Sequence, residues 1–77
     1  MKLVGDLVKL ESVFKDGVPM YSTWGNKEDG DEHAGIFRPS EIGIVLETTI
    51  HRGGNGVRVI VSGRIGWVNH NFLIDVV

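Results

Sequence analysis

The stretch that most constrains the fold is residues 41–77. It contains four short runs rich in valine, isoleucine and other apolar residues, at positions 42–46, 57–61, 65–68 and 72–77, separated by turns that carry glycine or asparagine. Beta-branched residues favour extended strands, and glycine-rich breaks of a few residues favour tight turns between antiparallel neighbours. This part of the sequence therefore predicts a small antiparallel β-barrel.

Residues 57–61 are the clearest single strand, because valine alternates there with arginine and isoleucine. Residues 62–64 are expected to form a tight hairpin into the next strand, residues 65–68. The strand at residues 42–47 is apolar on both faces, so we expect much of it to be covered on both sides.

The N-terminal stretch predicts a turn at residues 5–6 followed by the first strand. Val8 and Leu10 would face the core, while Lys9 and Glu11 would face solvent. A helix over residues 6–14 is the alternative, since apolar residues also recur there at helical spacing. The β-branched residues and the all-strand remainder of the chain favour the strand.

Residues 14–40 have no regular period and are interrupted by glycine and proline. We expect a folded loop, because its aromatic and other large apolar side chains are costly to leave in water. An irregular hairpin would pair residues 18–23 with residues 34–38. Its tip, residues 26–33, is acidic and lacks large apolar residues, and we expect it to be the most mobile part of the molecule.

Composition predicts one domain over residues 1–77, without cysteine for disulfides or thiolate metal sites. Eight basic and ten acidic residues give a formal charge of −2, so nucleic acid is not the expected partner. No apolar run approaches the ~20 residues that cross a bilayer, and an acidic residue interrupts the N-terminus before a signal-peptide core could form. We therefore expect a soluble, cytoplasmic protein without a membrane partner or a cofactor.

A resemblance to a known family begins with residues 66–73, Gly-Trp-Val-Asn-His-Asn-Phe-Leu, which resemble the end of an SH3 domain. Four positions match the SH3 pattern: Gly66, Val68, Asn71 and Leu73. Phe72 stands where SH3 domains carry tyrosine, and the Gly-Trp-Val triplet also resembles bacterial SH3 domains of cell-wall proteins. Together with residues 5–8 and 43–47, this ending resembles small SH3-like proteins encoded by tailed phages.

The resemblance implies an all-β, SH3-like antiparallel barrel of about five strands, with residues 14–40 as a long inserted loop. It also implies a non-enzymatic binding module. SH3 domains bind proline-rich peptides in an aromatic-lined groove. Here Asn69 replaces the proline of that groove, Phe72 lacks the tyrosine hydroxyl, and Val57 or Arg58 occupies the position of its tryptophan, so a protein partner of another kind is expected.

Acids, histidines and serines are conceivable metal ligands or nucleophiles, but their spacing fits no known site. They are Asp29, Asp31, Glu32 and His33 in one loop, His51 and His70 in predicted turns, and Ser22, Ser40 and Ser62. The acidic loop lacks the later ligands of a calcium loop, and the serines lack a nucleophile-elbow pattern. A solvated loop and surface histidines are the interpretations we favour, and we expect neither catalysis nor a metal site.

Aromatic and sulfur-containing side chains are the candidate contacts for a protein partner, because such residues dominate binding hot spots. The candidates are Met20, Tyr21, Trp24, Phe37, Trp67 and Phe72. The alternative, which we favour for the loop residues, is that they form a small core against the barrel. For a phage protein the partner would be a virion component or a host protein, met in the host cytoplasm.

Two other functions remain open on the sequence alone. The first is a structural role in a virion or a homo-oligomer, through an exposed sheet edge such as residues 57–61. The second is nucleic-acid binding through a local positive patch on the central hairpin, formed by Arg52, Arg58 and Arg64.

Overall fold

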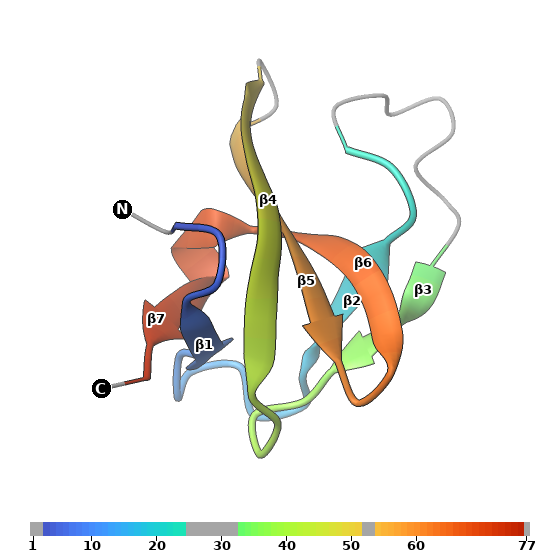
Figure 1. Cartoon of the computed structure of the whole chain (residues 1–77). Helices are drawn as coiled ribbons and strands as arrows, with labels where there is room; N and C mark the ends of the chain where they lie inside the picture. The colour runs from blue at the N-terminus through green and yellow to red at the C-terminus, as the bar shows by residue number, and fades with distance from the viewer. Residues whose placement is uncertain (1–2, 25–32, 52–53, 77) are drawn as a thin grey trace.

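The protein is an all-β half-barrel made of one curled antiparallel sheet (Figure 1). The computed structural model describes residues 3–24, 33–51 and 54–76. The strands are β1 (Leu7–Leu10), β2 (Val18–Tyr21), β3 (His33–Phe37), β4 (Gly43–His51), β5 (Gly54–Val61), β6 (Arg64–Asn69) and β7 (Leu73–Asp75), and a 3₁₀ turn, η1 (His70–Phe72), joins β6 to β7. The all-β prediction is confirmed, although the described residues form seven strands instead of about five.

The additional strands come from residues 14–40, which contribute to the sheet and do not merely cover it. The expected hairpin is confirmed: β2 and β3 pair from Val18 opposite Phe37 onward. Tyr21 then lies opposite Trp67, so β2 joins the sheet beside β6. The order across the sheet is β3-β2-β6-β5-β4-β1-β7.

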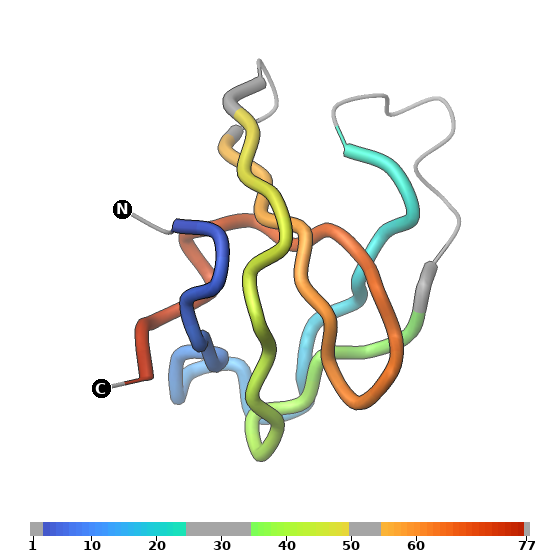
Figure 2. Tube along the Cα trace, viewed as in Figure 1, coloured from blue at the N-terminus to red at the C-terminus, as the bar shows by residue number. Residues whose placement is uncertain are grey.

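The first strand forms as expected, and the helical alternative for residues 6–14 is not adopted. Val8 and Leu10 are buried while Leu7 and Lys9 are exposed. β1 pairs with β4 on one side and with β7 on the other. In Figure 2 the blue start of the described chain therefore runs beside its red end.

The core fills the concave side of the sheet with small valines around two larger side chains, Met20 and Phe37, which are fully buried. Val8, Val45, Val57, Val59, Val61 and Val68 are the other fully buried side chains. Phe14 and Phe72 pack against this core with ring centroids 4.7 Å apart. A Cβ added to Gly43 would lie 2.9 Å from Val61 Cγ2, so a side chain there would crowd the core.

Two expectations about strand placement are wrong. Residues 57–61 are not an edge, because β5 pairs with β4 on one side and β6 on the other; β3 and β7 are the outer strands. The outer face of β4 is not covered, because Ile42, Ile44 and Leu46 are all exposed. The sheet curls around one side only, and no other described segment lies over the opposite side of β4.

Candidate partner-binding surface

Two of the six predicted contact residues, Met20 and Phe37, cannot touch a partner in the folded protein. Both are 0% exposed, so including them in the contact surface was wrong. The β2–β3 hairpin turns the face that carries them toward the valines of β4, β5 and β6. For these two residues the alternative of a small core against the barrel is the correct one.

Phe72 packs against the core. It lies on η1, is partly buried and packs its ring against Phe14 as well as against the buried residues. The turn that carries it is capped by Asn69, whose side chain accepts a hydrogen bond of 2.8 Å from the Asn71 backbone N–H. Tyr21, Trp24 and Trp67 are the remaining candidates, and none of them is among the residues packed against the core.

Trp67 and Tyr21 lie side by side on the outer face of the sheet. On β6, Gly66 and Val68 are buried, so Trp67 between them faces outward and is partly exposed. The register places Trp67 directly opposite Tyr21 on β2 and opposite Arg58 on β5. Directly opposed side chains are about 4.5–5.5 Å apart at Cβ, so these residues form one continuous row.

Trp24 reaches the same face from beyond the end of β2. A Cβ built on Gly56 would lie 2.5 Å from Trp24 Cδ1 and Nε1, which means that the indole covers the outward side of this glycine. Gly56 is two residues before Arg58 on β5, and the outward direction is the same at both positions. Trp24 is thus a diagonal neighbour of Trp67 across β5 and β6.

We call Tyr21, Trp24 and Trp67 the aromatic surface. All three are partly buried, so each has an anchored part and an accessible part. Aromatic side chains held in this way lose little conformational freedom when they bind, and their rings offer a large contact area.

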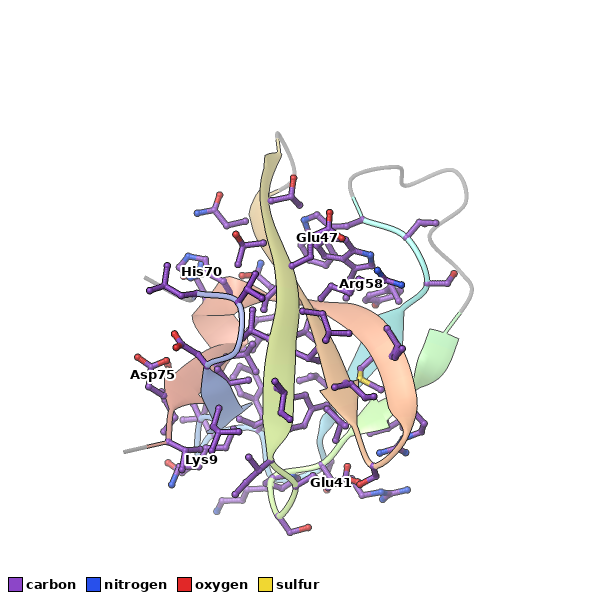
Figure 3. All side chains as sticks on the ribbon, in the orientation of Figure 1. Lys9, Glu41, Glu47, Arg58, His70 and Asp75 are labelled. Carbon is purple, nitrogen blue, oxygen red and sulfur yellow. The ribbon has the colours of Figure 1, made fainter. Side chains whose placement is uncertain are left out.

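A charged pair lies next to the aromatic surface. Arg58 on β5 and Glu47 on β4 are opposite each other, and Arg58 Nη1 lies 3.7 Å from Glu47 Oε1. Figure 3 shows both at the outer side of the sheet. Their side chains are 44% and 56% exposed, so this ion pair contributes little to stability. It supplies both signs of charge at the rim of the aromatic surface.

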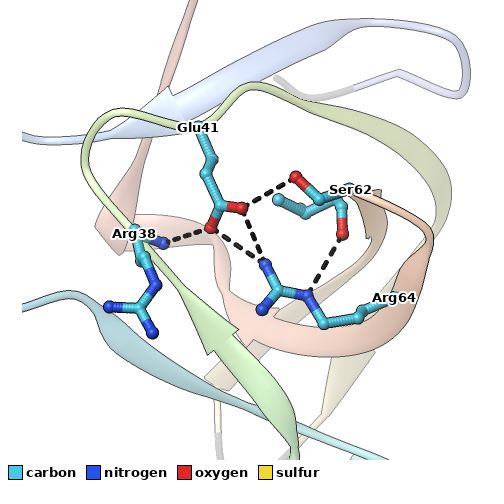
Figure 4. Close-up of polar contacts among 5 residues, drawn as sticks. Arg38, Glu41, Ser62 and Arg64 are labelled. Carbon is cyan, nitrogen blue, oxygen red and sulfur yellow. Dashed lines mark hydrogen bonds and ion pairs between the residues drawn. The ribbon is translucent and has the colours of Figure 1, made fainter.

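A separate polar cluster joins the turn before β4 to the β5–β6 hairpin (Figure 4). Arg64 Nη2 donates to both carboxylate oxygens of Glu41, at 2.9 and 2.8 Å. Ser62 Oγ donates to Oε2 at 2.8 Å, and the Arg38 backbone N–H donates to Oε1 at 3.0 Å. The Glu41 side chain is only 18% exposed, so all of these donors converge on a largely shielded carboxylate.

The pKa of Glu41 is lowered by this arrangement. Burial alone would raise the pKa, but hydrogen bonds from Ser62 and the Arg38 backbone, followed by the hydrogen bond and charge of Arg64, outweigh it. The cluster therefore holds an ionised carboxylate whose oxygens are already occupied. We assign it a structural role in fixing the hairpin against the turn.

Lowering the pH should reduce the free energy of unfolding through protonation of Glu41. Because its pKa is lower in the folded state than in the unfolded chain, ionised Glu41 stabilises the fold above the unfolded value of about 4.3. That contribution is lost as the pH falls through the folded pKa. We expect Glu41→Gln to cost about 1 kcal/mol at neutral pH and to flatten the acid limb of the stability curve. Urea unfolding midpoints measured from about pH 3 to pH 7 test this.

Glu47→Gln is the matched control, because it also removes one carboxylate opposite an arginine, but at an exposed position. Its free energy of unfolding at neutral pH should stay within about 0.5 kcal/mol of the parent. Equal curves for the two variants would contradict the role given to Glu41.

The predicted positive patch is largely neutralised where the structure describes it. Arg58 faces Glu47 and Arg64 binds Glu41, whereas Arg52 lies outside the described residues. The acidic loop with Asp29, Asp31 and Glu32 lies outside them as well.

No group of three or more histidine, cysteine, aspartate or glutamate side chains in residues 3–24, 33–51 and 54–76 could hold a metal ion. Within these same ranges, no helix has the length and apolar character to cross a membrane.

Sequence reasoning missed two surface features. One is a row of exposed apolar side chains across the outer face of four strands, which only the strand register reveals. The other is a hollow of about 400 Å³ lined by Lys9, Leu10, Ser12, Lys15, Pro39 and Ile74. Four of its residues lie within residues 9–15, but Pro39 and Ile74 are far from them in the sequence, so no local pattern could have indicated it.

No protein-family model matches this chain, and no curated protein or solved structure matches it either.

Proposed function

We propose that this chain is a non-enzymatic, SH3-like binding module that holds a protein partner on the aromatic surface. The observation that carries the proposal is the convergence of Tyr21, Trp24 and Trp67 on one outward region of β2, β5 and β6. Tyr21 and Trp24 come from one segment of the sequence, and Trp67 comes from a distant one. A cluster of partly exposed aromatic residues with charges at its rim is typical of the centre of a protein interface.

The SH3-like assignment is supported by the path of the chain. A first strand, a long hairpin, three antiparallel strands, one 3₁₀ turn and a short last strand follow one another in the order that the resemblance implies. The further step, to a phage-encoded accessory or host-modulating protein, rests on the resemblance alone. It would place the partner among virion components or host proteins in the host cytoplasm.

Truncation of the aromatic surface should reduce partner binding without unfolding the protein. We expect Trp24→Ala and Trp67→Ala each to weaken binding roughly tenfold or more, as loss of an interface hot spot does. Capture from an extract of the source cells identifies the partner, and titration calorimetry with the purified partner then measures the affinities. Val13→Ala is the control, because Val13 is 71% exposed and lies in a turn after β1, outside the aromatic surface.

A second variant separates binding from stability. Gly56→Ala changes none of the aromatic residues, but its methyl group would occupy the space of the Trp24 indole. Because Trp24 is a side chain at the surface, it can move aside, so we expect reduced binding and a nearly unchanged unfolding midpoint. If Trp24→Ala unfolds the protein, or if Gly56→Ala binds like the parent, the aromatic surface is misplaced.

A further inference from the structure

A continuous apolar row crosses the outer face of four neighbouring strands. Leu7 lies directly opposite Ile44, Ile44 opposite Ile60, and Ile60 opposite Ile65. Each of these residues has buried neighbours on its own strand, so the four side chains share the outward face. With strands about 4.8 Å apart, the row is about 14 Å long. We call Leu7, Ile44, Ile60 and Ile65 the apolar row.

Three of the four side chains of the apolar row are exposed, and Ile60 is partly buried. Leu7, Ile44 and Ile65 are 46%, 43% and 43% exposed, and the row is extended by Ile42, directly before β4, and by Leu46 on β4, at 53% and 36%. Isolated exposed apolar residues are normal on proteins, but a contiguous group of this kind marks an interaction site or an aggregation hazard. The row itself contains no charge that would select a charged ligand.

We propose that the apolar row is the interface of a symmetric dimer, in which two copies of this chain stack their sheets face to face. The two-fold axis lies in the interface, parallel to the strands, between β4 and β5. This operation places the partner's β5 over β4 and the partner's β6 over β1. Ile44 then meets the partner's Ile60, and Leu7 meets the partner's Ile65.

Charge complementarity selects a second copy and this orientation. The row next to the apolar row carries Glu47 on β4 and Arg58 on β5, directly opposite each other. The same axis brings Glu47 over the partner's Arg58 and Arg58 over the partner's Glu47, giving two ion pairs related by symmetry. An axis across the strands would instead place these charges over the row that contains Ile42 and Ser62, where they would be desolvated without partners.

The dimer is expected to be weak. The outer face is convex, so the contact is limited to the apolar row and its immediate neighbours. That is a few hundred Å² per copy, less than the ~800 Å² per partner of a standard interface. Tyr21 on β2 lies beyond the stacked strands, but Trp67 follows Ile65 by two residues on β6, so the dimer contact borders the aromatic surface. The dimer is argued from the apolar row and does not require the proposed function.

Sedimentation equilibrium from about 10 μM to about 1 mM tests the dimer. The parent should shift from monomer to dimer over this range, and Ile44→Lys should weaken association at least about tenfold because it buries a charge in the interface. Ile65→Lys is the second variant if Ile44→Lys fails to fold. Val13→Lys makes the same change at an exposed site outside the row and should dimerise like the parent.

Two charge reversals test the orientation. Glu47→Arg and Arg58→Glu each place like charges opposite one another in a homodimer, so each variant alone should remain monomeric. When the two variants are mixed, all facing charges become opposite in sign, and a heterodimer should form. Native mass spectrometry of the mixture, with the two variants isotopically distinguished, detects it.

Three results would overturn the proposal. They are a parent that stays monomeric throughout, a dimer that Ile44→Lys does not weaken, and charge variants that fail to associate when mixed. A monomeric parent whose captured partner is lost in Ile44→Lys would assign the row to that partner. Loss of the dimer with partner capture retained would support the proposal and leave the aromatic surface unaffected.

Discussion

Phe37→Ala is expected to lower the free energy of unfolding by about 3–5 kcal/mol. Phe37 is the largest fully buried side chain, and it contacts the side of Gly43 as well as the valine core. Its removal forfeits apolar burial and leaves a cavity among strands that cannot close around it. Because domains of this size hold only about 5–15 kcal/mol in total, and short chains fall at the lower end, the variant should be largely unfolded near body temperature.

Ile36→Ala provides the matched comparison, because it truncates the neighbouring residue on β3 at a position that is 39% exposed. We expect a loss of at most about 1 kcal/mol there. Thermal and urea unfolding followed by circular dichroism measure both variants. Similar losses at the two positions would mean that β3 does not close the core.

Gly17→Ala is the second large effect, with an expected loss of about 2–4 kcal/mol. Gly17 has a φ of 84°, in the region that costs an L-residue about 1–2 kcal/mol. In addition, a Cβ there would lie 2.7 Å from the Phe37 backbone oxygen and 2.9 Å from Ile36 Cγ2. The backbone oxygen cannot move without shifting the β2–β3 pair, so the contact adds strain to the conformational cost.

Gly5→Ala separates these two contributions. Gly5 has a φ of 92°, but no atom lies within 4 Å of a Cβ placed on it. It should therefore cost only about 1–2 kcal/mol, the conformational share alone. Urea unfolding of both variants gives the difference, which measures the contact between residue 17 and β3. If Gly5→Ala lowers the free energy of unfolding as much as Gly17→Ala does, close packing at Gly17 does not contribute to the loss.

Phe37→Ala and Gly17→Ala both act at the hairpin that carries Tyr21, so they should also reduce partner binding through loss of structure. Trp24→Ala and Gly56→Ala should reduce binding with little loss of stability. The two classes of variant thus distinguish residues that stabilise the fold under the aromatic surface from residues that belong to the surface itself.

Strands whose pattern is local could be predicted from the sequence. β1, β5 and β6 lie where alternation places them, with Val8, Leu10 and the valines of β5 inward. The turn between β5 and β6 was also expected from its glycine, and Ser62 and Gly63 both have the positive φ that a type I′ hairpin turn requires. The β2–β3 hairpin was expected from its apolar residues, but its pairing with β6 was not, because the described register pairs β2 with β6 at a single position, Tyr21 opposite Trp67.

The candidate site was predicted only in part. The sequence marks Tyr21, Trp24 and Trp67 as aromatic residues in plausible places, but it marks Met20 and Phe37 equally, and these are core. Which face of β2 and β3 turns inward depends on how the hairpin docks, and hydrophobicity alone cannot indicate this. The contact of Trp24 with Gly56 joins residues that are far apart in sequence, so no local pattern reveals it.

The sequence alone determined that this chain is all-β, because alternation and turn chemistry act between neighbouring residues. It also determined that the core is built largely from valine. The tertiary structure decided which strands are edges, which aromatic residues are buried and which apolar residues remain outside. Those outcomes depend on strand order and register, which bring residues such as Leu7, Ile44, Ile60 and Ile65 into one row although no short segment contains more than two of them.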